Sequence, residues 1–483
     1  MKLVTKLYKH QIKAVEKLSK IKVGALYMEM GTGKTRTALE LIKQRLDRGK
    51  VDHVLWLCPC SVKENLKRDI LKHCEGNLSM FTICGIETLS SSIRANAILL
   101  KLVQEKNVYL IVDESNLVKN HMAKRTQNII RLASMCNYKL ILNGTPISKN
   151  EKDLFSQWYI LDWRILGYQS FWSFAGNHLE YDPDIPGKIN RCLNTDYLVR
   201  KIAPYAYQVQ KSECLDLPLK SYGTHYYDLT ESQDWHYLEV ADKLMFEVDE
   251  FKPETIYRLF SGLQSVISGF EVISTKQPMK RKPFFDKPMD NPRIRALFEL
   301  IDTTNDKVII FCKYTQEILD IVTEINKKYG DYTAVPFYGK MNFKKRQKSI
   351  DMFRKKAQFF VANKTCAGYG LNLQFCSYII YYSNDWTYAT RAQSEDRVHR
   401  IGQTNNVHII DICASNTLDV KILDSLYRKE NLVDSFKSEL EHQKDKNYIK
   451  SFIRGKTLDG KKHYSKSKLK VLKEDKDGQN LYR

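Results

Sequence analysis

A glycine-rich loop followed by lysine and threonine is the clearest chemical signal in the sequence. Residues Glu29–Thr35 read EMGTGKT and stand between an apolar run, Val23–Met28, and a helix-like stretch, Thr35–Leu46. Such a loop presents backbone N–H groups to phosphate at a helix N-terminus, while the lysine meets the β- and γ-phosphates and the hydroxyl binds Mg²⁺. The strict pattern has glycine where this chain has Met28. The residues predicted to bind nucleotide phosphates and Mg²⁺ are Gly31, Thr32, Gly33, Lys34 and Thr35.

A pair of carboxylates follows a second apolar run. Tyr109–Val112 is succeeded directly by Asp113 and Glu114. A carboxylate at the carboxyl end of a parallel strand lies where Mg²⁺ needs a ligand, and the adjacent glutamate can orient or deprotonate an attacking water. An Asp-Glu pair in this place is also a common helix N-cap. Because the pair follows the phosphate loop in chain order, we predict that Asp113 binds Mg²⁺ and Glu114 activates water.

A basic segment near the end of the chain has a third kind of spacing. Residues 393–403 read QSEDRVHRIGQ, so Gln393, Arg397 and Arg400 would share one face of a helix that stops at Gly402. Two guanidinium groups on a second lobe could reach a γ-phosphate bound on the first, as arginine fingers do. The alternative is a solvated basic helix. We predict the catalytic role for both arginines and a nucleotide contact for Gln393.

Apolar runs rich in β-branched and aromatic residues alternate with helix-like stretches in two parts of the chain. In the first part these runs are Val23–Met28, Val54–Leu57, Val108–Val112 and Leu140–Leu142, and in the second Val308–Cys312, Phe359–Ala362, Tyr378–Tyr382 and Val407–Ile412. The alternation predicts two α/β lobes built on parallel sheets, at residues 1–150 and 293–440.

The remaining segments differ in composition from these lobes. Residues 151–275 carry aromatic-rich helical patterns, at Asp153–Trp163 and Gln233–Phe246, and are predicted to form a helical insertion. Four prolines in residues 276–292 predict an interlobe linker, because prolines this close disrupt helices and central strands. Residues 441–483 are predicted to be a basic tail, either solvated or in contact with nucleic acid.

The net charge and the cysteine spacing indicate which partners and metals to expect. The 483 residues carry a net charge of +21, which favours a polyanionic partner, nucleic acid first. None of the 11 cysteines forms a CxxC pair, so no structural zinc is expected. The sequence has no signal-peptide pattern and no apolar stretch long enough for a membrane span, so no membrane association is expected.

The motifs together resemble the SWI/SNF-type DNA-dependent ATPases of helicase superfamily 2. The resemblance covers about residues 5–435, and its segments occur in the family's order. They are Leu7–Gln11, the phosphate loop, Cys58–Ser61 with Asn65, Asp113-Glu114 with Lys119-Asn120, Asn143–Pro146 with Asn150, Val308–Phe311, Ala367–Leu373 and Gln393–Gln403. The family implies two RecA-like P-loop NTPase lobes with ATP and Mg²⁺ between them, and movement along double-stranded DNA.

Several residue roles are implied by this resemblance alone. Gln11 would recognise adenine, Gly370 would contact the nucleotide, and Thr145 would couple nucleotide state to lobe movement. The implied DNA contacts come from the backbone around Pro59, Ser61, Thr88, Lys313 and Lys364. Departures from the family pattern include Asn116, Lys364-Thr365 and the threonine after Trp386.

Other functions stay open from the sequence. The same engine could separate DNA strands, act on RNA, or remodel or displace a protein partner bound to DNA. A nucleic-acid-binding scaffold without catalysis is a different class, and the intact candidate site residues argue against it. The compact form resembles bacterial and phage members, which implies the cytoplasm of a bacterium or infected host cell, or the nucleus if the source is eukaryotic.

Overall fold

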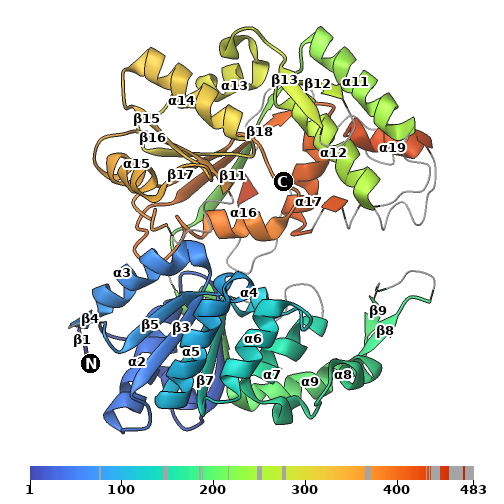
Figure 1. The fold of residues 1–483 in the computed structure, drawn as a ribbon. Coiled ribbons are helices and arrows are strands. Elements are labelled where there is room, and N and C mark those ends of the chain that lie inside the picture. Colours follow the sequence, from blue (N-terminus) through green and yellow to red (C-terminus); the bar gives the residue numbers. More distant parts are fainter. Residues whose placement is uncertain are drawn as a thin grey trace. The chain divides into compact units, whose positions relative to one another are not determined.

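The computed structural model divides the chain into two compact units (Figure 1). Unit 1 comprises residues 1–216 and 369–371, and unit 2 comprises residues 217–368 and 372–483. The residues that the structure describes are 1–75, 78–144, 151–183, 187, 189–215, 217–246, 253–274, 279–364, 371–430, 432–433, 436, 446–455 and 472–473.

Unit 1 is built on a six-stranded parallel sheet with the order β10-β2-β7-β6-β3-β5. The strands are β2 (Val23–Met28), β3 (His53–Cys58), β5 (Phe81–Gly85), β6 (Val108–Asp113), β7 (Tyr138–Asn143) and β10 (Ala206–Val209). Because all six run the same way, their carboxyl ends share one edge of the sheet. Every residue of β3 is buried, as expected for a strand covered on both faces.

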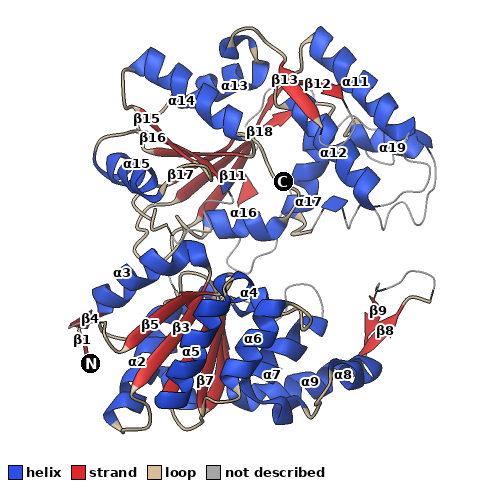
Figure 2. Ribbon diagram, viewed as in Figure 1, coloured by secondary structure: helices blue, strands red, loops and turns tan. Residues whose placement is uncertain are grey.

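Helices cover both faces of this sheet, as Figure 2 shows in blue around red strands. One face packs against α1 (Lys9–Leu18), α2 (Lys34–Asp47) and α3 (Lys63–His73). The other packs against α5 (Ile93–Glu105), α6 (Lys124–Ala133) and α7 (Lys152–Leu166). Alternate residues of each strand feed the two cores, so that Leu55 and Leu57 lie in one and Val54 and Trp56 in the other.

Smaller elements complete unit 1. They are the strand pairs β1 (Lys2–Leu3) with β4 (Cys74–Glu75) and β8 (Leu179–Tyr181) with β9 (Ile189–Cys192), and the helices α4 (Thr88–Ser91), α8 (Phe171–His178), α9 (Thr195–Ile202) and α10 (Lys211–Cys214).

Unit 2 has a seven-stranded sheet with the order β15-β16-β14-β17-β18-β11-β19. The strands are β11 (Lys220–Tyr227), β14 (Val308–Cys312), β15 (Ala334–Phe337), β16 (Phe359–Asn363), β17 (Tyr378–Tyr381), β18 (Val407–Ala414) and β19 (Leu472–Lys473). All pairings are parallel except that of β19 with β11. This sheet therefore also has one edge where six carboxyl ends meet.

The helices and remaining hairpin of unit 2 surround this sheet. They are α11 (Glu231–Phe246), α12 (Pro253–Ile267), α13 (Pro292–Ile301), α14 (Thr315–Tyr329), α15 (Phe343–Lys355), α16 (Tyr388–Glu395), α17 (Leu418–Tyr427) and α19 (Lys446–Ile453), with the hairpin β12 (Phe270–Ser274) and β13 (Lys280–Pro283).

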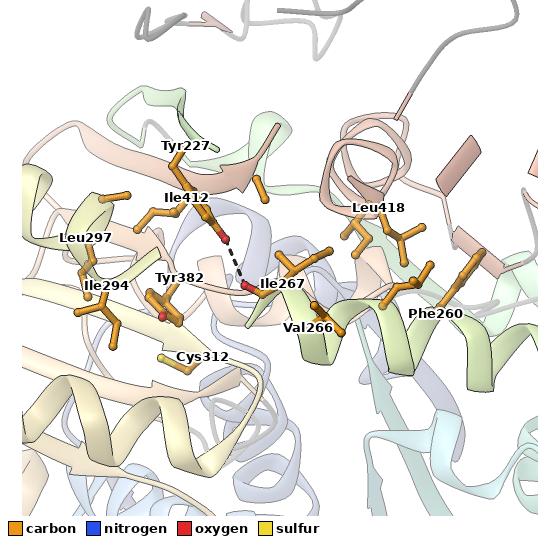
Figure 3. Close-up of a cluster of buried hydrophobic side chains, with 14 of the residues drawn as sticks. Tyr227, Phe260, Val266, Ile267, Ile294, Leu297, Cys312, Tyr382, Ile412 and Leu418 are labelled. Atoms are coloured by element: carbon orange, nitrogen blue, oxygen red, sulfur yellow. Dashed lines mark hydrogen bonds between the residues drawn. The ribbon is translucent and has the colours of Figure 1, made fainter. Parts of the chain in front are cut away.

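A continuous hydrophobic core joins the sheet of unit 2 to α12, α13 and α17 (Figure 3). In this core the Tyr227 hydroxyl donates a hydrogen bond of 3.3 Å to the carbonyl of Ile267 at the end of α12. The guanidinium of Arg293, 1% exposed, lies in the same core and forms a 2.6 Å ion pair with Asp419. A buried charge of this kind is tolerated only with its partner in place.

The boundaries between parts differ from those expected in residues 151–275 and 276–292. The first segment is shared, since α7–α9 pack in unit 1 whereas β11, α11 and α12 belong to unit 2. Lys280–Pro283 forms β13, Pro288 begins a 3₁₀ turn and Pro292 is the first residue of α13. Prolines suit strand edges and first helical positions, so a proline-rich segment can be structured rather than a linker.

Part of the expected basic tail also belongs to the core. In α19 the side chains of Ile449, Phe452 and Ile453 are buried, and Arg454 pairs with Asp234 at 2.8 Å. The Tyr237 hydroxyl donates to the carbonyl of Ile453 at 2.7 Å. Among the described residues, no helix has the length and apolar character that crossing a membrane requires.

We predict that Asp419→Asn destabilises unit 2 by about 3–5 kcal/mol, because it leaves the Arg293 guanidinium buried without a counter-charge. Thermal unfolding should show the loss, and hydrogen exchange should locate it in α13 and α17. The double variant Arg293→Met with Asp419→Leu should recover most of it. If Asp419→Asn unfolds at the temperature of the unsubstituted protein, the pair is not the constraint that we infer.

Candidate nucleotide site

The phosphate loop joins β2 to α2 with the geometry expected from the sequence. Gly31 and Gly33 have φ angles of 83° and 88°, in the left-handed region that favours glycine. Gly33 is the N-cap of α2, which begins at Lys34, so the first free N–H groups of the helix face the loop. The Lys34 ammonium bends over the loop and donates to the Met28 carbonyl at 2.8 Å. Thr35 follows on the first turn of α2.

Helix α1 holds this loop from the side. The Gln11 amide nitrogen donates to the carbonyls of Thr32 and Gly33, at 3.1 and 3.3 Å, and His10 Nε2 donates to the Thr32 carbonyl at 2.8 Å. A Cβ atom built on Gly33 would lie 2.2 Å from the Gln11 amide nitrogen. The positive φ favours glycine at position 33, and a larger residue would also displace the Gln11 amide from the loop. The role of Gln11 in recognising adenine stays a prediction.

The two carboxylates lie at the same edge of the sheet, two strands from the loop. In the ladder Tyr27 is level with Asn143 on β7, and Leu142 is level with Asp113 on β6. Asp113 ends β6, and its Oδ1 accepts the Glu114 backbone N–H at 2.9 Å. Glu114 has a φ of 50°, a conformation that is uncommon outside glycine and marks a constrained turn.

Burial raises the pKa of Asp113 to about 7, and the neighbouring Glu114 carboxylate adds to this rise while the Lys34 ammonium opposes it. A carboxylate so placed is stabilised by a cation, and carboxylate and hydroxyl oxygens are ligands that suit Mg²⁺. Loop amides, Lys34, Thr35 and Asp113 thus make a donor and acceptor set that fits a nucleotide triphosphate with its metal ion.

Helix α7 braces the segment after the carboxylates. The hydroxyl of Ser115, fully buried, donates to the Gln157 side-chain carbonyl at 2.5 Å, and the Lys119 ammonium lies 3.3 Å from Asp153. On the neighbouring strand, Asn143 accepts the Gly144 N–H at 2.8 Å. These contacts fix the backbone around Glu114. Thr145, the predicted coupling residue, lies outside the described residues.

The arginines of unit 2 are not placed as the sequence suggested. Helix α16 ends at Glu395, so it carries Gln393 but neither Arg397 nor Arg400. Residues 396–402 form turns and bends, in which Val398 is fully buried and the Gln403 N–H donates to the Arg400 carbonyl at 3.0 Å. The expectation of one helical face was wrong. Arg400 donates to the Asn372 side chain at 2.6 Å, and Gly370 lies outside the described residues.

Three of the expected DNA-contacting residues gather at one edge of unit 1. Pro59 and Ser61 follow β3 and Thr88 follows β5, which is paired with β3. The Cys60 N–H donates to Glu87 at 2.8 Å, and the thiol of Cys60 lies 3.4 Å from the Thr88 hydroxyl. These contacts bring the two loops together. Ser61 is exposed, whereas Pro59 and Thr88 are half-buried.

Lys313 and Lys364 follow β14 and β16 and are held by internal contacts. The Lys313 ammonium donates to the Gln264 side chain and lies 4.0 Å from the ring centre of Trp386. Lys364, 2% exposed, donates to the Asn384 side chain at 3.1 Å. Burial lowers the pKa of each lysine to about 8. The ammonium of Lys364 is thus part of the interior, and only a backbone contact to DNA stays a prediction for it.

The structure reveals a polar cluster that the sequence did not. Asn384 accepts from Arg391 at 3.1 Å and donates to Asp411 at 2.7 Å, while Arg391 forms two hydrogen bonds with Asp411, of 2.6 and 2.9 Å. Gln264, fully buried on α12, donates to the Asn384 carbonyl at 2.6 Å and accepts from the Trp386 indole at 2.9 Å. No motif or periodic pattern marks these residues, because their partners lie far apart in sequence.

The fold and the site define a P-loop ATPase of helicase superfamily 2, made of two RecA-like lobes. Comparison with known families agrees: the SNF2-related domain matches residues 10–268 and the helicase conserved C-terminal domain matches residues 292–402. The chain belongs to the SNF2-related family, as its motifs suggested.

Its relatives are distant in sequence. The uncharacterized ATP-dependent helicase YqhH of Bacillus subtilis (strain 168) is 25% identical over 477 residues, covering 92% of this chain and 82% of that protein. The RAD54-like DNA repair and recombination protein of Drosophila willistoni is 24% identical, covering 84% of this chain and 59% of that protein. The SWI2/SNF2 ATPase core of Sulfolobus solfataricus, solved with dsDNA, is 22% identical with a TM-score of 0.39, covering 94% of this chain and 98% of that one.

The raised pKa of Asp113 generates a prediction about stability. Above pH 7 the Asp113 carboxylate is ionised in the folded protein, and burying that charge costs folding free energy. Asp113→Asn removes the charge, so it should stabilise the folded chain by about 1–3 kcal/mol at pH 8. The gain should shrink by pH 5, where Asp113 is already neutral in the folded protein but ionised in the unfolded chain. Thermal unfolding at the two pH values measures this. The exposed Asp331→Asn is the control, and an equal gain in both variants would contradict the assignment.

Proposed function

We propose that this protein hydrolyses ATP and uses the energy to move along double-stranded DNA. The observation that carries the proposal is the edge of the unit 1 sheet, where the phosphate loop and the Asp113-Glu114 pair lie two strands apart. This is the arrangement that P-loop motors need for phosphoryl transfer to water.

Each residue of the edge has a distinct task in this proposal. The α2 N-terminus and Lys34 bind the phosphates, and the ammonium leaves the Met28 carbonyl to do so. Thr35 and Asp113 hold Mg²⁺, which supplies charge neutralisation on the phosphates when bound. Glu114, fixed by its constrained backbone, accepts a proton from the attacking water. The buried Ser115 and its contact with Gln157 keep Glu114 in place.

The role of unit 2 in hydrolysis is the second part of the proposal. Arg397 and Arg400 complete the site by stabilising charge on the γ-phosphate when the two units close, and Gln393 and Gly370 contact the nucleotide. The turn that carries the arginines is anchored by the buried Val398, which supports a fixed presentation. Thr145 couples the nucleotide state to closure.

Duplex DNA is the partner that best fits the protein's charge and relatives. The net charge of +21 favours a phosphate backbone, and relatives carry names such as RAD54-like DNA repair and recombination protein and ISWI chromatin-remodeling complex ATPase. Backbone groups around Pro59, Ser61, Thr88, Lys313 and Lys364 form the track. Remodelling or displacement of a DNA-bound protein is the outcome of such movement, and it needs no separated strands.

The test compares ATP turnover without nucleic acid and with single-stranded DNA, duplex DNA and RNA. Turnover should rise most with duplex DNA, and Lys34→Ala should abolish it in every condition because the phosphate-binding ammonium is gone. Equal stimulation by a single strand would support a strand-separating helicase instead, and strongest stimulation by RNA an RNA motor. No turnover in any condition would indicate a binding scaffold.

A second prediction tests the arginines. Arg400→Ala should retain ATP binding within about threefold, since the phosphate loop and Asp113 are intact, but should lose at least about 10³-fold in turnover with duplex DNA. Nucleotide affinity and turnover are measured side by side, with Arg428→Ala, at an exposed arginine of unit 2, as the control. An Arg400→Ala protein that still responds to DNA would refute the arginine-finger role.

A further inference from the structure

Helix α15 of unit 2 carries an exceptional concentration of positive charge. Residues 340–356 contain eight lysines and arginines and a single acidic residue, Asp351. This segment of 17 residues therefore supplies a net charge of +7, a third of the +21 of the whole chain. The nucleotide site and the proposed DNA track make no use of it.

The two arginines within α15 lie over aromatic rings, whereas the lysines of the segment are exposed to solvent. Arg346 lies over the ring of Phe337 and Arg354 over that of Phe375, at 6.0 and 5.6 Å from the ring centres. The fully buried Phe353 anchors the helix to the sheet. Within the described part of the chain, the exposed lysines of this segment have no acidic partner; they are Lys340, Lys344, Lys345, Lys348, Lys355 and Lys356.

Three of the lysines form a straight stripe along the helix. Lys344, Lys348 and Lys355 are four and seven residues apart, so their side chains lie on one face over about 16 Å. Asp351 lies on the same face, and Gln347 donates to it at 2.8 Å. Like charges four residues apart, such as Lys344 and Lys348, destabilise a helix by roughly 0.2–0.5 kcal/mol, and Asp351 is the one opposite charge on this face.

The stripe starts at the edge of the sheet where the proposed track lies. Helix α15 connects β15 to the parallel strand β16, so it runs from the carboxyl edge back to the amino edge (Figure 1). Lys344 is thus on the side of Lys313 and Lys364, and Lys355 is on the far side. A polyanion held at the carboxyl edge could continue along α15.

The chemistry of the stripe fits a phosphate backbone. All exposed residues described on α15 are charged, so the helix lacks the apolar face that a membrane surface would require. Lysines act as point charges without the bidentate geometry that reads bases, which suits sequence-independent contact. Duplex DNA carries one negative charge per about 1.7 Å of helix axis, so a 16 Å stripe faces several phosphates at once.

We infer that the Lys344–Lys348–Lys355 face of α15 is a second DNA-binding surface, which grips the phosphate backbone of the duplex outside the track. The inference rests on the proposed function, since it assumes that duplex DNA is the partner. Its effect is on affinity rather than on chemistry. The stripe lowers the DNA concentration that stimulates turnover and leaves the maximal rate to the track and the nucleotide site.

The test uses the triple variant Lys344→Gln, Lys348→Gln, Lys355→Gln. The matched control replaces three exposed lysines that form no ion pair within the described residues, as Lys106→Gln, Lys287→Gln, Lys327→Gln. Binding to a fluorescent 30-base-pair duplex of mixed sequence is measured by anisotropy over a salt series. The slope of log affinity against log salt should fall by about 2–3 in the stripe variant, near one per lysine, and by less than about 1 in the control.

Two further measurements distinguish DNA binding at this surface from DNA binding at the track and from a general effect of net charge. The stripe variant should need at least about tenfold more duplex for half-maximal ATPase stimulation, with the saturated and DNA-free rates unchanged. Asp351→Asn, which removes the only acid of the stripe, should shift the DNA requirement the opposite way. Equal salt slopes of DNA affinity in the stripe and control variants would overturn the inference. Equal slopes are the result expected if the stripe bound an acidic protein instead of DNA. If the unsubstituted protein fails to bind duplex DNA, the proposed function itself is refuted.

Discussion

The register between three neighbouring strands of unit 1 is the constraint on which the nucleotide site depends. The β2–β7 ladder sets Tyr27 level with Asn143, and the β7–β6 ladder sets Leu142 level with Asp113. Since side chains alternate along a strand, a slip of one residue in either ladder would turn the buried residues of β6 outward. The same slip would move Asp113 away from the phosphate loop. Packing of the two cores thus fixes how the phosphate loop and Asp113 lie relative to each other, and no dedicated contact between Lys34 and Asp113 is needed.

Unit 2 uses the corresponding edge of its sheet differently. In place of a phosphate loop it has an interior polar cluster, in which Asn384 and Asp411 bind the guanidinium of Arg391, and Arg391 lies 3.5 Å from the ring centre of Tyr381. Gln264 joins this cluster to helix α12. Buried networks with their hydrogen bonds made are rigid, and those missing one member are costly. Lys313 after β14, Lys364 after β16 and Asn384 after β17 are consequently held together, which suits a surface that must keep its shape while a motor works.

Much of this architecture could be predicted from local patterns. Buried parallel strands are continuous apolar runs in the sequence. The run Val23–Met28 coincides with β2 and the run Val308–Cys312 coincides with β14, residue for residue. The phosphate loop was recognisable because its chemistry is contiguous. Strands β5, β10, β11 and β15 were missed, since they are short or polar and owe their pairing to partners far along the chain. The spacing of Arg397 and Arg400 predicted one helical face, whereas the helix ends at Glu395 and the arginines lie on the turns and bends that follow.

Strand β11 has a consequence for how the protein is made. It enters the sheet of unit 2 beside β18, and Lys220 pairs with Val407, 187 residues further along the chain. During synthesis at about 5–20 residues per second, β11 leaves the ribosome many seconds before its partner exists. Its row of backbone N–H and C=O groups is unpaired for that interval, and an unpaired strand edge invites pairing with other chains. Unit 1 also contains a distant pairing, because Ala206 of β10 lies beside Ala25 of β2, but all six of its strands are translated by residue 209. The sheet of unit 2, in contrast, is completed only after β18 (Val407–Ala414) has been translated.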